Sequence, residues 1–265
     1  MTGARRVLVG LALAVVAFPY LWVVLAAFKG PADLSDPSKV VFTPTLANWR
    51  EVVAGGIFRS ALTSLTVGVI TVGLSLVAGT MAAYAISRWR AGGPVTRFGI
   101  LLSELMPPAV LVVPLFLVLF RLDLRDTAWA VVVAHLTFVL PVVTWFMIGF
   151  FDAVPTELEE QAMVDGYGRF QAFRRVVLPQ VLPGLGAAAI FAFVLSWNDL
   201  FYALVLAGGQ AKTLPVAIAG FNTFRGVELG AMSAAILVSV VPVLVASFFV
   251  QRRLIRGISA GGLKG

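Results

Sequence analysis

Four polar side chains lie within long apolar stretches of this chain: Glu104, His135, Asn198 and Asp199. A charged group at membrane depth costs about 2.5–3.5 kcal/mol on insertion scales, so such groups usually face a cavity or a polar partner. Asn198 and Asp199 are expected well inside one helix, next to Trp197. Amides and carboxylates bind hydroxyl groups, and an indole stacks on flat apolar faces, so this set favours a path for a hydroxylated ligand. The alternative is that Asp199 pairs with a basic residue of a partner subunit.

Prolines interrupt the same apolar stretches. Glu104 precedes Pro107 and Pro108, and Pro114 and Pro141 lie further along. Proline breaks the helical hydrogen-bond ladder, and non-helical backbone at membrane depth is tolerated where it is buried or lines a water-filled cavity. Transporters place such breaks near their binding sites, although for any single proline simple kinking for packing is the expectation.

Two features could suggest metal or enzyme chemistry. His135 is the single histidine of the chain and lacks the further ligands that a metal site needs, so we expect a packed or interface histidine. Residues 257–261 read G-x-S-x-G, the pattern of a serine nucleophile after a strand. Here Ser259 follows an apolar run, no histidine comes after it, and the match is interpreted as chance.

Composition indicates a membrane protein. Of 265 residues, 60% are hydrophobic and 12% are charged, and the mean hydropathy is +0.96, values that exclude an ordinary soluble domain. Each apolar run is long enough for a helix of about 20 residues to cross the hydrocarbon core. The runs are 7–28, 61–87, 98–120, 128–151, 182–206 and 229–250. The prediction is an all-α polytopic membrane protein with six transmembrane helices in a single domain, 1–265.

Basic residues predict the orientation. Twelve of the 20 Lys and Arg fall on one side of the predicted spans: Arg5, Arg6, Arg88, Arg90, Arg97, Arg169, Arg174, Arg175, Arg252, Arg253, Arg256 and Lys264. The positive-inside rule places both termini in the cytoplasm. It gives an extracytoplasmic loop at 29–58, a cytoplasmic loop at 152–181 and a cytoplasmic tail at 252–265. The net charge of +7 follows from this topology and from anionic lipid, and needs no nucleic acid.

The loop at 152–181 has the pattern of two short helices. Thr156 and Glu159 are spaced as a capping box, which predicts a helix that begins after Pro155 with its acidic residues at the positive end. Asp165 and Gly166 then predict a tight turn.

A second amphipathic stretch follows that turn. Phe170, Phe173 and Val177 recur at spacings of three and four, and Pro179 is expected to stop the helix. Such a pair of helices with an apolar face can dock on another protein. The alternative is an ordinary amphipathic connection between spans.

The second apolar run carries a stripe of small residues. Ser64, Gly68, Thr71, Ser75, Gly79 and Ala82 are spaced three and four apart, so they share one helix face. Small residues allow another helix to approach closely. An abundance of small residues in this chain is the alternative explanation.

The spacing of the cytoplasmic loop resembles a known motif. Glu160-Gln161-Ala162, then three residues, Gly166, nine residues and Val176-Val177-Leu178-Pro179 resemble the EAA loop, E-A-A-x3-G-x9-I-x-L-P, of binding-protein-dependent ABC importer permeases. Gln161 and Val176 depart from the pattern without changing its spacing.

Four further segments resemble the maltose-type, carbohydrate-uptake members of that family. They are the P-T-L-A-N-W at 44–49, the A-A-Y-A-I-S-R at 82–88, the W-N-D at 197–199 and the A-G-G-L-K-G at 260–265.

The resemblance implies a type I ABC importer permease fold and a pore-forming subunit in the bacterial plasma membrane. Such a subunit belongs to an ATP-driven importer and moves a carbohydrate, a polyol or a glycerol phosphate by alternating access. The resemblance implies no cofactor on this chain and no enzyme activity, with ATP and Mg on a partner ATPase; the lack of a Walker A sequence agrees. The implied partners are a second homologous permease in a heterodimer, two ATPase subunits, an extracytoplasmic sugar-binding protein and membrane lipid.

The resemblance also assigns a coupling role to the loop, and the tail after Arg256 is expected to add an ATPase contact. The implied coupling residues are Glu159, Glu160, Gln161, Ala162, Asp165, Gly166, Phe170, Phe173, Leu178 and Pro179, and the expected substrate path comprises Glu104, Trp197, Asn198 and Asp199. The alternatives from other classes are a self-contained channel or secondary transporter, which internal inverted repeats would favour, and a membrane enzyme that uses Ser259 and His135. The sequence does not identify the sugar.

Overall fold

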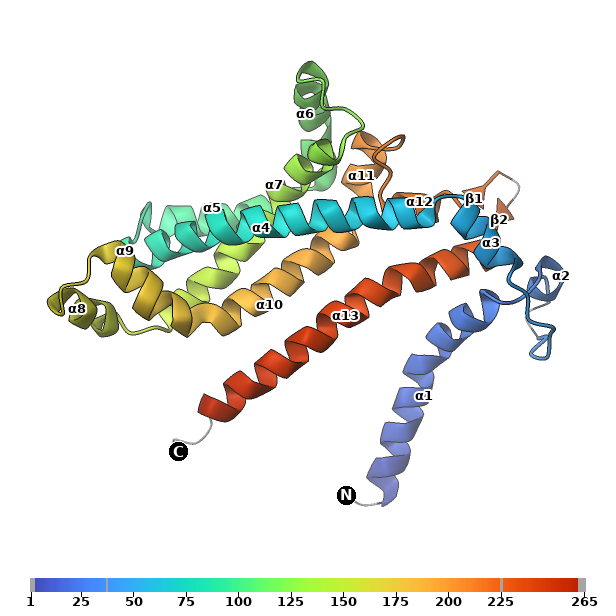
Figure 1. Cartoon of the computed structure of the whole chain (residues 1–265), viewed down its shortest axis with the longest axis horizontal. Coiled ribbons are helices and arrows are strands. Elements are labelled where there is room, and N and C mark those ends of the chain that lie inside the picture. Colours follow the sequence, from blue (N-terminus) through green and yellow to red (C-terminus); the bar gives the residue numbers. More distant parts are fainter. Residues whose placement is uncertain (1–2, 37, 225, 262–265) are drawn as a thin grey trace. The chain divides into compact units, whose positions relative to one another are not determined.

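The computed structural model describes residues 3–36, 38–224 and 226–261, which are mostly helical (Figure 1). The elements are α1 (Gly3–Ala26), α2 (Pro31–Leu34), α3 (Ala47–Ala54), α4 (Ile57–Trp89), α5 (Gly93–Glu104), α6 (Pro108–Arg121), α7 (Ala128–Asp152), α8 (Glu157–Val164), α9 (Arg169–Ala172), the π-helical η1 (Phe173–Val177), α10 (Leu178–Trp197), α11 (Phe201–Leu206), α12 (Leu214–Ala219), the antiparallel pair β1 (Asn222–Thr223) and β2 (Gly226–Val227), and α13 (Leu229–Gly261). The residues 262–265 of the predicted tail lie outside the described residues.

The chain divides into two compact units. One comprises residues 1–62 and 214–242, and the other comprises residues 63–213 and 243–265. Within the described residues, five helices are long and apolar enough to cross a membrane, and a bent pair brings the number to six. The all-helical membrane architecture expected from the apolar runs is therefore confirmed.

The third predicted span is not one helix. α5 and α6 meet at an angle of 89° between Glu104 and Pro108. Pro108 has no N–H to donate to the preceding turn, and Pro107 adopts an extended ψ of 132°, so the helical ladder cannot continue through this pair. Pro114 and Pro141, in contrast, lie inside α6 and α7 without ending them.

The fifth predicted span is also interrupted, and this corrects the expectation that Asn198 and Asp199 lie well inside a helix. α10 ends at Trp197 and α11 begins at Phe201. Asn198 Nδ2 donates to the carbonyl oxygen of Val194 at 2.9 Å, and Asp199 Oδ2 accepts from the backbone N–H of Ala203 at 3.2 Å. Side chains that bond nearby backbone in this way compete with the regular ladder.

The core of the larger unit is formed by α4, α7 and α10. α7 packs against α5, α6, α10 and α11. The side chains of Val143, Met147 and Phe151 from α7 are fully buried and meet Ala83 of α4 and Val181 of α10. Apolar side chains make up most of this packing, and a few buried polar ones, such as Thr71, Ser75 and Thr144, lie among them.

The small residues of α4 allow this close packing. A Cβ at Gly79 would lie 3.0 Å from Val143 Cγ1 of α7, and a Cβ at Gly68 would lie 3.2 Å from the Phe193 ring of α10. The buried stripe runs from Ser64 to Gly79, but Ala82 is exposed, and Ala83 is the buried residue instead.

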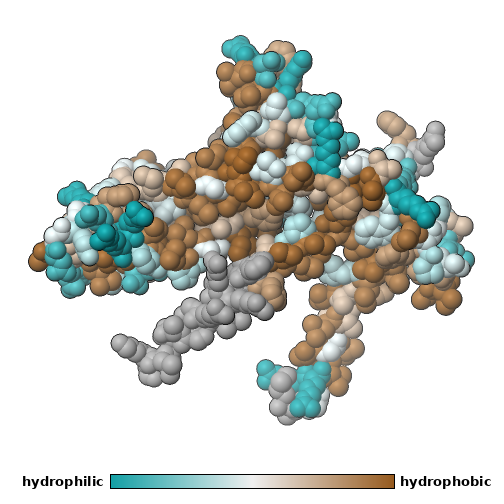
Figure 2. All heavy atoms as spheres, viewed as in Figure 1, coloured by the Kyte–Doolittle hydropathy of each residue, from teal (hydrophilic) through white to brown (hydrophobic). Residues whose placement is uncertain are grey.

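In the smaller unit, α1 is exposed from Arg5 to Leu21, with hydrophobic sides (Figure 2). Its end is fixed by Asn48 of α3, whose Nδ2 donates to the carbonyl oxygens of Ala27 at 3.1 Å and Lys29 at 2.8 Å. These carbonyls follow the last turn of α1 and have no helical partner, so the buried amide satisfies them.

Candidate functional site

The loop with the conspicuous spacing begins with α8 and a tight turn. The N–H of Gly166 donates to Met163 O at 3.1 Å, and the N–H of Tyr167 donates to Ala162 O at 3.0 Å. These two bonds form a Schellman motif, which needs a left-handed residue after the helix. Gly166 supplies it with φ +89°, so the turn expected at Asp165-Gly166 is present.

The predicted capping box at the start of α8 is wrong. Thr156 makes no side-chain cap bond and has helical backbone angles, φ −67° and ψ −28°. The Glu159 side chain does not reach back to Thr156, because it has stronger partners elsewhere: Arg88 Nε lies 3.1 Å from Oε2, and the Tyr84 hydroxyl donates to Oε1. A charge-assisted bond to a guanidinium outweighs a bond to one backbone amide.

Tyr84 and Arg88 are functional candidates that sequence reasoning missed. They are four residues apart at the end of α4, so they share one helix face. α8 and α9 lie at this end of α4 (Figure 1). Both residues belong to the segment 82–88 that resembles the family pattern. The local sequence, however, did not indicate which distant residue the pair would bind.

The remaining acidic residues of α8 face outward. Glu157, Glu160, Gln161 and Asp165 are exposed and, with Val164, line a surface hollow of about 410 Å³. Hydrophilic atoms gather at this end of the unit in Figure 2. Ala162, the third residue of the E-Q-A triplet, lies on the buried side of α8.

The second half of the loop continues into the membrane helix, so the expectation that Pro179 stops it is also wrong. α9, η1 and α10 follow one another without a break. Pro179 cannot donate to the carbonyl of Arg175, and just before it the ladder widens to π-type bonds, with Leu178 N–H bonded to Phe173 O. Proline is therefore accommodated in the first turn of α10.

The aromatic residues of this half have different environments. Phe173 packs on Tyr84, with ring centroids 4.5 Å apart, whereas Phe170 is 70% exposed. Leu178 is half-buried and joins the core beside α7. The loop thus presents exposed apolar side chains, Val164 and Phe170 foremost, and an acidic hollow to its surroundings.

A cavity of about 380 Å³ lies in the larger unit beside the bend between α5 and α6. Glu104 and Asp199 both line it, together with Phe138 and Tyr202, whose rings stack at 5.6 Å. Glu104 Oε1 is buried and has no hydrogen-bond partner among the described residues. An unsatisfied buried oxygen facing a cavity is suited to accept a hydrogen bond from a ligand or water.

His135 is 1% exposed and binds residues at the end of α10. Its Nδ1 lies 2.8 Å from Ser196 Oγ, and its Nε2 lies 3.1 Å from Asp199 Oδ2. The expected packed histidine is therefore also a hydrogen-bonded one. Among the described residues, no group of three or more His, Cys, Asp and Glu side chains could hold a metal ion.

The other two residues of the expected path lie apart from this cavity. Trp197 is buried at 2% exposure and stacks on Phe193, with centroids 5.5 Å apart. Asn198 is exposed, and its amide group bonds the α10 backbone. Of the expected set, the structure brings together Glu104 and Asp199.

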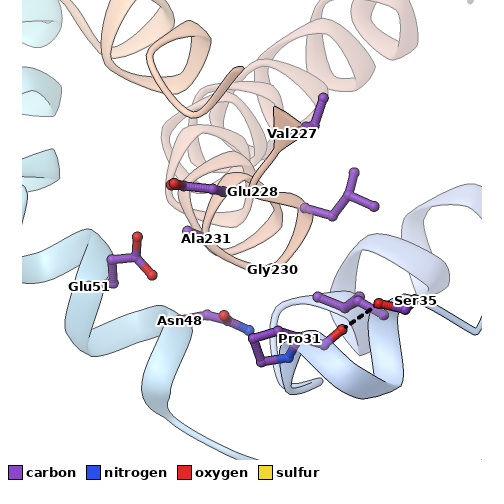
Figure 3. Close-up of a pocket in the computed structure, with 10 residues that line it drawn as sticks. Pro31, Ser35, Asn48, Glu51, Val227, Glu228, Gly230 and Ala231 are labelled. Carbon is purple, nitrogen blue, oxygen red and sulfur yellow. Dashed lines mark hydrogen bonds between the residues drawn. The ribbon is translucent and has the colours of Figure 1, made fainter. Parts of the chain in front are cut away.

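A second cavity, of about 450 Å³, lies in the smaller unit (Figure 3). Glu51 of α3 and Glu228, just before α13, both line it, near Asn48. Burial, followed by the negative charge and hydrogen bond of Glu228, raises the pKa of the Glu51 carboxyl above its usual range. No sequence pattern singled out these two carboxyls.

Comparison with known proteins gives one explanation for both the loop motif and the fold. The family model of binding-protein-dependent transport system inner membrane components matches residues 75–260, which include the loop at 152–181 and both halves of the broken spans. The chain belongs to this family.

Relatives that match almost the full length of the permease support this family assignment. It is 36% identical to the trehalose transport system permease protein of Mycobacterium tuberculosis, over 99% of this chain and 100% of that protein. It is 32% identical to a diacetylchitobiose uptake system permease protein of Streptomyces coelicolor, over 94% of this chain and 92% of that one. A chain in the crystal structure of a bacterial ABC transporter involved in the import of the acidic polysaccharide alginate has the same fold, with a TM-score of 0.76, 21% identity and 94% of both chains covered.

The permease is therefore a multi-pass inner-membrane subunit of a binding-protein-dependent ABC importer and is not itself an enzyme. ATP belongs to a partner ATPase. The G-x-S-x-G segment at 257–261 lies inside α13, which leaves no strand and turn to present a nucleophile.

Proposed function

We propose that this permease forms the translocation pore for a carbohydrate or a related polyol. Two relatives are named for trehalose and diacetylchitobiose transport, and a third, 32% identical, for sulfoquinovosyl glycerol. Sugars and sugar conjugates are the common element of these names. The complete importer comprises this chain, a second homologous permease, two ATPase subunits and an extracytoplasmic binding protein.

The single observation that carries the coupling role is the exposed face of α8 and its turn. Glu160, Gln161, Asp165 and Gly166 project from the unit beside a hollow, and Phe170 is exposed nearby. An acidic hollow with an adjacent apolar anchor suits a partner that offers basic and apolar groups. In the proposed topology this face lies in the cytoplasm, where the ATPase docks.

The proposed substrate path passes the cavity beside the α5–α6 bend. Glu104 and Asp199 provide acceptors for sugar hydroxyls, and the stacked rings of Phe138 and Tyr202 provide an apolar face. Transport proceeds by alternating access, in which closure of the ATPase dimer moves the loop at 152–181 and the helices attached to it.

Purification tests this proposal directly. The tagged permease is extracted from its native host in mild detergent, and every co-purifying protein is identified. We expect an ATPase, a second permease and a binding protein, whose bound sugar is then identified by mass spectrometry. Recovery of the permease alone, active in vesicles without ATP, would overturn the proposal.

A further inference from the structure

Glu159 differs from every other acidic residue of α8 because its carboxylate points into the protein. It is 8% exposed, whereas Glu157 and Glu160 on the same helix are exposed. Both of its oxygens are used: Oε1 accepts from the Tyr84 hydroxyl and Oε2 from Arg88 Nε. Glu159 is therefore unavailable as a contact for the ATPase.

Arg88 holds two elements at once. Besides Glu159 of α8, its Nη1 donates to Phe151 O at 3.2 Å and its Nη2 donates to Val154 O at 3.0 Å. These carbonyls belong to the last residues of α7 and the link to α8, where helical donors run out. A single guanidinium thus joins α4, α7 and α8 through its planar fork.

The contact is shielded from water. The side chains of Arg88 and Glu159 are 6% and 10% exposed, so separating them leaves two buried charges without their counter-ions. Because separating the two charges costs free energy, Arg88 and Glu159 are expected to stay paired when α8 moves. Tyr84 adds a packed ring, which contacts Phe173 of η1 and Phe151 of α7.

We propose that Tyr84 and Arg88 are positioning residues that hold Glu159 as an internal joint, through which movement of α8 reaches α4 and α7. This inference rests on the proposed coupling function of the loop. It assigns the inner face of α8 to transmission within the permease and leaves the outer face to the ATPase.

The test measures sugar molecules moved per ATP hydrolysed by the complete complex in proteoliposomes. Tyr84→Phe removes only the hydroxyl, and Arg88→Lys keeps the charge but loses the fork. We expect both variants to assemble with the ATPase and to lower the ratio by about fivefold, as for disrupted coupling networks. A purely structural role would lower the yield of complex and leave the ratio unchanged.

Arg97→Lys is the matched control. Arg97 also binds a carboxylate at this end of the unit, but its two hydrogen bonds go to Asp152 of α7, at 2.9 and 3.2 Å, so we expect a normal ratio. If the assembled complexes of Tyr84→Phe and of Arg88→Lys both keep the wild-type ratio, Tyr84 and Arg88 do not transmit the movement of α8. The proposed function then still stands. If wild-type uptake needs no ATP, the proposed function fails and this inference fails with it.

Discussion

His135 and Asp199 are 64 positions apart in the sequence, and their side chains meet with 3.1 Å between Nε2 and Oδ2. The same histidine lies 2.8 Å from Ser196 Oγ, and the same carboxylate oxygen accepts from Ala203 N–H. One side chain of α7 therefore fixes both the end of α10 and the start of α11. The break in the fifth span is held by specific bonds.

The first prediction concerns Asp199. Asp199→Asn keeps an acceptor for Ala203 but removes the charge from the cavity wall, so hydroxyl groups lose a charged acceptor. We expect normal assembly and a half-saturating sugar concentration for uptake about tenfold higher, measured with the sugar found on the binding protein.

Ser196→Ala is the control for Asp199. It removes one bond to His135 without altering the lining of the cavity, so we expect the half-saturating concentration to stay within about twofold of the wild type. If Asp199→Asn only reduces the yield of assembled complex, Asp199 serves an interface instead of the path.

The second prediction concerns Gly166. At φ +89°, a β-branched residue is strained by about 1–3 kcal/mol, so Gly166→Val should distort the turn after α8. We expect normal insertion, with sugar uptake reduced about tenfold or more because the α8 surface is misplaced. Gly168→Ala is the control, since Gly168 has φ −68° and a Cβ added there would meet nothing within 4 Å. Equal uptake by both variants would argue against the coupling role.

The third prediction concerns Asp126, which joins two loops of the larger unit. Its carboxylate accepts backbone N–H groups from Gln210 at 2.7 Å, Gly209 at 3.0 Å and Ala211 at 3.3 Å. The bond from Gln210, with those from Ala211 and Gly209, lowers the pKa of Asp126 below its usual range, against the opposing effect of burial.

Because the folded pKa of Asp126 is lowered, its contribution to stability is present above the unfolded value of about 3.9 and is lost as the pH falls through the folded value. Asp126→Asn should lower the thermal midpoint in detergent by about 2–4 °C at pH 7, and the difference should shrink toward pH 3. Asp123→Asn removes the same charge from a residue with the same left-handed φ of 55°. An equal loss in both variants would mean that net charge, and not the three amide bonds, is responsible.

The fourth prediction concerns the contact of α10 with α7. A Cβ at Gly184 would lie 2.5 Å from the Phe150 ring, whereas a Cβ at Gly186 would meet nothing within 4 Å. Gly184→Ala should destabilise the permease by about 1–3 kcal/mol through overpacking. Gly186→Ala should be neutral or slightly stabilising, because alanine reduces the entropy of the unfolded chain. Thermal unfolding of the two variants side by side gives the comparison. Equal unfolding midpoints would show that Phe150 and α7 shift without cost to make room for the added methyl group.

The sequence predicted features that depend on local or periodic chemistry. Apolar length located the spans, and Gly166 marked the turn because only a left-handed residue completes that cap. The spacing of small residues in α4 predicted a close approach of helices, and the structure confirms it at Gly68 and Gly79.

Features that depend on distant partners could not be predicted. The Thr156–Glu159 capping box obeys a local rule. The Glu159 carboxylate instead binds Arg88 and Tyr84, which lie 71 and 75 positions away in the sequence. In the run at 182–206 the side chains with an amide or a charge are Asn198 and Asp199, and the break there also involves a bond from Asp199 to His135, 64 positions away. Sequence spacing carries no information about such partners.

The right-angled bend between α5 and α6 has a consequence for the bilayer itself. With 12 and 14 residues, and a rise of about 1.5 Å per residue, the two arms are about 18 and 21 Å long, well short of a hydrocarbon thickness of about 30 Å. At 89°, the arms cannot add their lengths along one axis. Where these arms meet lipid the bilayer must thin, and otherwise neighbouring protein must replace the lipid, so neither arm alone spans a bilayer of ordinary thickness.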